Sequence, residues 1–76
     1  MISVAQIKAA RAMLGWSTQV LAEAAGVSVA TVKKYEQQTG IPRASARVLN
    51  AIMMALSRAG ITFTGDPLVN PGVTLN

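Results

Sequence analysis

A chain of 76 residues forms one small domain and leaves no room for a second hydrophobic core. Seven Lys and Arg against three Asp and Glu give a net charge of +4, which favours a polyanionic partner, either nucleic acid or an anionic membrane. Because the chain has no Cys, no His and only three scattered acids, it lacks groups for disulfides, metal binding or acid–base catalysis, and we expect a non-enzymatic protein without cofactor or metal.

The first predicted helix covers residues 3–14. Ser3 is its candidate N-cap, and Gly15 ends it. One face carries apolar residues at helical spacing, but Arg11 lies on or beside that face, where a charge is costly unless it is paired. The face consists of Val4, Ile7, Ala10, Arg11 and Leu14.

Two short helices joined by a tight turn are predicted next, at residues 18–25 and 28–37. Gly26 ends the first of them, since glycine readily takes the positive φ that follows a helix, and Ser28 caps the second. The inward residues are Leu21, Ala22, Ala25, Val32 and Tyr35. This layout is typical of a helix-turn-helix, whose second helix lies in the major groove of DNA.

A longer helix at residues 44–59 and a β-hairpin complete the predicted elements. Pro42 breaks the chain before this helix, and Gly60 is its expected C-terminal cap. Two β-rich runs at residues 61–64 and 72–75 are separated by turn residues and form the hairpin. An isolated hairpin is unstable in water, so it must pack on the helices or pair with another chain.

These features resemble the Cro/repressor-type (XRE-like) helix-turn-helix family of bacterial and phage regulators, over roughly residues 7–60. The matching residues are Leu21, Ala22, Ala25, Gly26, Val27, Val32 and Tyr35. The resemblance implies a mainly α fold, a four-helix repressor-like domain that binds DNA, at residues 1–60. Members of the family usually end in further short helices, whereas residues 61–76 form a β tail here. We expect this tail to be part of the same domain or a dimerisation element.

The resemblance also implies an ion pair between an arginine of the first helix and a glutamate near the end of the recognition helix. Arg11 and Glu36 match these two positions. Mutual neutralisation where the two helices meet explains why a charge lies on an otherwise apolar face. We therefore expect the pair to be structural.

Three parts of the chain are expected to contact DNA. The start of the second helix corresponds to a phosphate contact in the family, the first turns of the recognition helix face base edges, and the start of the last helix grips the backbone. The expected contact residues are Thr18, Gln19, Ser28, Val29, Ala30, Thr31, Lys33, Lys34, Arg43 and Arg47.

The side chains at the start of the recognition helix limit how it can read bases. Val29 and Ala30 form no hydrogen bonds, so they either contact a thymine methyl group or are solvent-facing helix formers. Lys33 and Lys34 point about 100° apart, so one can reach a base while the other reaches the backbone. Arg58 is expected to be a solubilising charge.

We therefore expect a DNA-binding transcriptional regulator that uses residues 28–37 in the major groove and binds double-stranded DNA as a symmetric homodimer. The hairpin, with Met53 or Met54, is the expected dimer surface. The alternative is a protein-interaction module with a protein partner, such as an antitoxin or phage immunity factor, whose DNA binding is weak or secondary. No apolar run approaches the roughly 20 residues of a membrane span, and no signal-peptide pattern is present, so a cytoplasmic location is expected.

Overall fold

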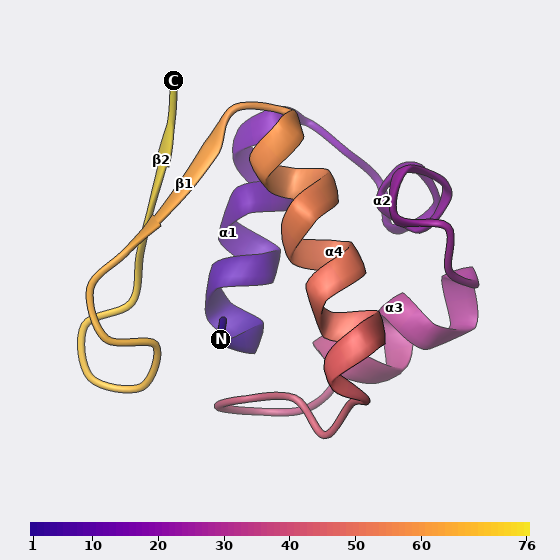
Figure 1. Cartoon of the computed structure of the whole chain (residues 1–76), viewed down its shortest axis with the longest axis horizontal. Helices are drawn as coiled ribbons and strands as arrows, with labels where there is room; N and C mark the ends of the chain where they lie inside the picture. Colours follow the sequence, from indigo (N-terminus) through magenta and orange to yellow (C-terminus); the bar gives the residue numbers. More distant parts are fainter.

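Four helices followed by a two-stranded antiparallel sheet make up the computed structural model, which describes all 76 residues (Figure 1). The elements are α1 (Val4–Leu14), α2 (Thr18–Ala25), α3 (Val29–Glu36), α4 (Ala46–Arg58), β1 (Ile61–Thr64) and β2 (Gly72–Leu75). In Figure 1, α1 and α4 form the centre, with α2 and α3 on one side and the hairpin on the other. The predicted mainly α fold and both strands of the hairpin are confirmed.

A serine begins every helix, and its hydroxyl accepts a hydrogen bond from a backbone N–H of the first turn. These caps are Ser3, Ser17, Ser28 and Ser45. Their backbones are extended, which explains why α1 and α3 begin one residue later than predicted. The cap at Ser45 is not among the predicted caps, and the predicted start of the last helix at residue 44 is wrong by two residues.

The C-terminal ends of α3 and α4 also differ slightly from the prediction. Residue 37 is the cap that follows α3 rather than its last residue. The cap of α4 is Ala59, and Gly60 follows it with a φ of 106°. Gly60 therefore lies one residue after the cap and provides the positive φ that turns the chain into β1.

The core lies where α1, α4 and the helix-turn-helix pair meet. Its fully buried large side chains are Ile2, Ile7, Leu21, Val32, Ile52 and Leu56. The inward face of α4 consists of the buried residues Leu49, Ile52, Ala55 and Leu56, whereas Met54 is 48% exposed and Met53 lies at the margin of the core. Ile2 is buried although it precedes the predicted first helix.

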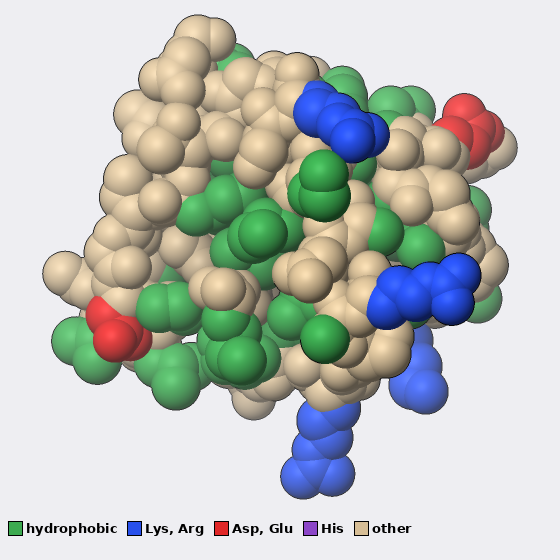
Figure 2. Space-filling model, in the orientation of Figure 1, with side chains coloured by type: hydrophobic (Ala, Val, Ile, Leu, Met, Phe, Trp, Pro, Cys, Tyr) green, Lys and Arg blue, Asp and Glu red, His purple; other side chains and the backbone are tan.

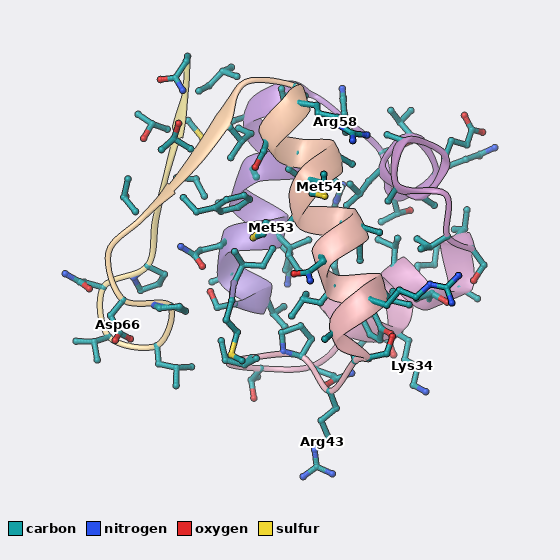
Figure 3. The ribbon with its side chains drawn as sticks, viewed as in Figure 1. Lys34, Arg43, Met53, Met54, Arg58 and Asp66 are labelled. Carbon is teal, nitrogen blue, oxygen red and sulfur yellow. The ribbon has the colours of Figure 1, made fainter.

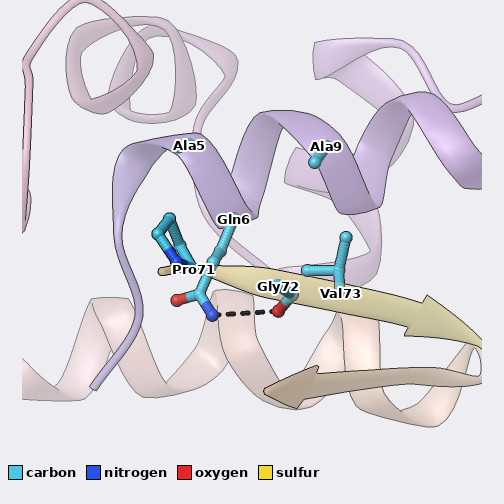
Figure 4. Close-up of a pocket in the computed structure, with 6 residues that line it drawn as sticks. All are labelled: Ala5, Gln6, Ala9, Pro71, Gly72 and Val73. Carbon is cyan, nitrogen blue, oxygen red and sulfur yellow. Dashed lines mark hydrogen bonds between the residues drawn. The ribbon is translucent and has the colours of Figure 1, made fainter. Parts of the chain in front are cut away.

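The hairpin packs on the helices through one face. Ile61 is buried, and Phe63 and Val73 pack against the core, whereas the threonines of both strands are exposed. Gln6 anchors the end of the ladder: its side-chain amide donates to the Thr64 carbonyl oxygen at 3.2 Å and to the Gly72 carbonyl oxygen at 3.0 Å, and Figure 4 shows the second of these bonds. The hairpin thus packs on the helices, which is one of the two arrangements expected for it.

None of the four helices combines the length and the apolar character that crossing a bilayer requires.

Candidate nucleic-acid interface

The orientation of α3 is determined by its two buried side chains. Val32 and Tyr35 point into the core, with 1% and 8% of their surfaces exposed. Since neighbouring residues on a helix point about 100° apart, the opposite face of α3 is directed to solvent. Ala30, Lys33 and Lys34 are exposed on this face.

A short, left-handed turn joins α2 to α3. Gly26 has a φ of 71°, and nothing lies within 4 Å of the position that a Cβ atom would take there. The glycine is therefore required by its backbone conformation and not by crowding. The amide of Val27 donates to the Ala22 carbonyl oxygen at 3.0 Å, which closes the end of α2 before Ser28 caps α3.

The ion pair between Arg11 and Glu36 joins the end of α3 to α1. The guanidinium donates through Nε and Nη2 to the two carboxylate oxygens at 2.9 and 2.8 Å, and through Nη1 to the Trp16 carbonyl oxygen at 3.0 Å. The Arg11 and Glu36 side chains are 23% and 9% exposed. This bidentate geometry satisfies the charge that the sequence leaves on the face of the first helix.

The basic residues around α3 have no acidic partners. Arg11–Glu36 is the only salt bridge in the structure, and it neutralises the only acid of α3. The exposed residues that keep an uncompensated charge in this region are Lys33, Lys34, Arg43 and Arg47. Lys34 and Arg43 extend into solvent at the same end of the molecule, whereas Arg58 lies at the other end of α4 (Figure 3).

The segment that carries Arg43 is held by hydrogen bonds at both ends. The Arg43 amide donates to the side-chain oxygen of Gln38 at 2.6 Å, and the amide of Val4 donates to the Gly40 carbonyl oxygen at 2.8 Å. Pro42 is buried between these points. Gln38 is not among the residues predicted for this site, because a side chain that accepts from a backbone amide five positions later leaves no periodic pattern in the sequence.

Arg47 lies beside the turn between α2 and α3. It lines a surface groove of about 300 Å³ together with Gly26 and Val27 of the turn and Ser45 and Val48 of the start of α4. The turn and the first turn of α4 therefore form one surface, although they are about 20 residues apart in the sequence.

Other expected contact residues are partly occupied by local contacts. Val29 is half-buried and packs against the core, and the Thr31 hydroxyl lies 2.8 Å from that of Ser28. The Gln19 amide lies 3.4 Å from a carboxylate oxygen of Glu23, and Thr18 is half-buried.

A family model described as Helix-turn-helix matches residues 7–57, well over half of the chain. The chain belongs to the XRE-like helix-turn-helix family. No curated protein and no solved structure matches it. The XRE-like family consists of DNA-binding transcription regulators, which agrees with the resemblance seen in the sequence. The match ends within α4, so the hairpin lies outside it.

Proposed function

We propose that this protein is a transcriptional regulator that inserts α3 into the major groove of double-stranded DNA. The four uncompensated basic residues carry the proposal: Lys33 and Lys34 on α3, Arg43 in the loop and Arg47 at the start of α4. The only acid of α3 is bound internally by Arg11 and does not oppose a phosphate. We assign Lys33 and Lys34 to bases and phosphates, and Arg43 and Arg47 to the phosphate backbone.

If Lys33 and Lys34 make these contacts, one copy of α3 distinguishes base sequences only weakly. Ala30 offers only a methyl contact, and the hydroxyl groups of Ser28 and Thr31 are engaged with each other at 2.8 Å. Two copies bound to a palindromic site, with half-sites about 34 Å apart, would strengthen the weak base preference of a single α3. We therefore propose binding as a symmetric homodimer in the cytoplasm of a bacterium or of a phage-infected cell.

Substitution of a basic residue on α3 tests the proposal. Lys34→Ala is expected to weaken binding to random-sequence duplex DNA and to reduce the slope of log K against log salt by about one, because each lost phosphate contact releases about one counterion fewer. Lys33→Ala follows the same expectation if it contacts a phosphate. Fluorescence anisotropy at several salt concentrations measures both quantities.

Arg58→Ala is the matched control, since it removes the same charge from the opposite end of α4 (Figure 3). Its salt slope is expected to equal that of the unchanged protein. Equal slopes for Lys34→Ala, Arg58→Ala and the unchanged chain would refute the assignment of α3, and no salt-sensitive binding at micromolar protein would refute DNA binding itself.

A protein-interaction role is the second candidate, and the tip of the hairpin favours it. Leu68 and Val69 are 65% and 82% exposed, and their amides both donate to the Asp66 carboxylate, which orders the loop. An ordered loop that presents two apolar side chains suits a protein partner. Absence of salt-sensitive DNA binding would favour this role over the first.

A further inference from the structure

The outer edge of β2 has unpaired backbone groups. The Asn76 amide donates to the carbonyl oxygen of Gly60, its directly opposite residue, at 2.8 Å. Hydrogen-bonded and non-hydrogen-bonded pairs alternate along an antiparallel ladder, so Thr74 also turns its N–H and C=O toward β1. Val73 and Leu75 lie between these positions, and their N–H and C=O groups therefore point away from β1.

This edge is only four residues long, but it carries none of the charges, prolines or bulges that prevent many edge strands from pairing. The strand β2 contains no charged residue and no proline, and Asp66 in the loop is the only charged residue from Gly60 to the end of the sequence. In the view of Figure 2 the basic side chains lie away from the hairpin. An edge without charge, proline or a bulge is a template for another strand.

The C-terminal half of the β2 edge is exposed, whereas Gly72 and Val73 at its start line a groove together with Ala5 and Ala9 of α1 (Figure 4). β1 follows α4 directly through Gly60, and its first residue, Ile61, is 3% exposed. Leu75 in β2 is 43% exposed, and the C-terminal end of β2 lies at the outer margin of the molecule (Figure 1).

We infer that the β2 edge binds the β2 edge of a second copy of this chain, antiparallel, with Thr74 on the twofold axis. In this register Val73 of each copy pairs with Leu75 of the other, and four backbone hydrogen bonds form between the copies. The two hairpins become one four-stranded sheet. The inference deepens the proposed function and rests on it for its role on DNA, because it names the surface of the proposed dimer.

The side chains of β2 are complementary to themselves in this register. Opposite residues project from the same face of a sheet, so the exposed Leu75 of each copy lies beside Val73 of the other. Val73 already packs against the core, and the pairing therefore extends the apolar face. On the other face the exposed Thr74 side chains meet each other, and no like charges approach.

A pair of lysine substitutions tests this register. Thr74 and Thr62 are opposite each other in the hairpin and both are exposed, so Thr74→Lys and Thr62→Lys add the same charge to the same face. Only Thr74→Lys sets two charges opposite each other at the twofold axis, and it is expected to raise the dimer dissociation constant at least about fivefold. Thr62→Lys is expected to change it less than about twofold. Sedimentation equilibrium of the full chain without DNA measures both constants.

A mixture of Thr74→Lys and Thr74→Glu chains provides the rescue experiment. Opposite charges then face each other, and the mixed dimer is expected to form at least as well as the dimer of the unchanged chain. A monomeric unchanged chain, equal effects of the two lysine substitutions, or no recovery in the mixture would each overturn the inference. Because no DNA is present, these outcomes are separate from the salt-slope test of DNA binding.

Discussion

At the scale of single residues, Arg11 shows how an apparent violation of the apolar pattern becomes a structural contact. Its guanidinium donates to Glu36 twice and to the Trp16 carbonyl oxygen once, and thereby connects α1, the link to α2 and the end of α3. Any other arrangement would leave a cation on a largely buried helix face without a partner. The cost of such an unpaired charge exceeds that of an ordinary surface substitution.

Glu36→Ala is expected to lower the free energy of unfolding by about 2 kcal/mol. This is less than the roughly 3–5 kcal/mol for a fully buried pair, because the Arg11 side chain remains 23% exposed and regains some hydration. Glu23→Ala, which removes an exposed acid from α2, is expected to change stability by less than about 0.5 kcal/mol. Urea unfolding followed by circular dichroism compares the two, and similar midpoints would contradict a structural role for the pair.

At the scale of elements, Gln6 determines how the hairpin packs. Its side-chain oxygen accepts from the Ser3 amide at 3.0 Å as part of a capping box, and its side-chain nitrogen donates to both strands of the hairpin. The side chain of Gln6, which is 3% exposed, thus helps to cap α1 and also holds the end of the ladder that lies next to the loop. The Ser-x-x-Gln spacing indicates only the first of these two contacts.

Gln6→Glu separates the two contacts. The carboxylate keeps the acceptor for Ser3, but it removes the donor and faces the carbonyl oxygens of Thr64 and Gly72, so stability is expected to fall by about 2 kcal/mol or more. Exchange of the Thr74 amide is expected to accelerate more than exchange in α4. Gln19→Glu makes the same chemical change on an exposed helix and is the control. Unchanged exchange at Thr74 would show that Gln6 does not anchor the hairpin.

At the scale of the whole molecule, the distribution of charge divides the surface into two parts. Four uncompensated basic residues surround α3 and the start of α4, whereas the segment that follows Gly60 carries only Asp66. A dimer formed through the hairpins would therefore bring together two regions that carry no basic residue and leave both basic regions free for phosphates. Repulsion between the positively charged copies is smallest in such an arrangement.

The free energy of unfolding of a small domain that dimerises increases with the protein concentration. If the β2 edges pair, the midpoint of thermal unfolding is expected to rise measurably when the protein concentration is increased a hundredfold. Thr74→Lys should make the midpoint nearly independent of concentration, and Thr62→Lys should not. Differential scanning calorimetry over this concentration range measures the effect, and a constant midpoint for the unchanged chain would contradict dimerisation.

The sequence by itself determined the helix-turn-helix, the number and order of the elements and both strands of the hairpin. These features depend on local signals, namely apolar residues at helical spacing, serine caps, Gly15 and Gly26 after helices, and β-rich runs separated by turn residues. The pairing of Arg11 with Glu36 also followed from the family resemblance, because the fold of the family brings these two positions together.

Which polar groups form internal hydrogen bonds and which remain free became clear from the folded arrangement alone. Gln6 reaches across almost the whole chain to the hairpin, Gln38 closes the loop that carries Arg43, and Ser28 and Thr31 engage each other. The packing of the hairpin on the helices also depended on the surfaces of α1 and α4. Such contacts join residues whose spacing in the sequence has no period, so they become visible only when the elements have been brought together.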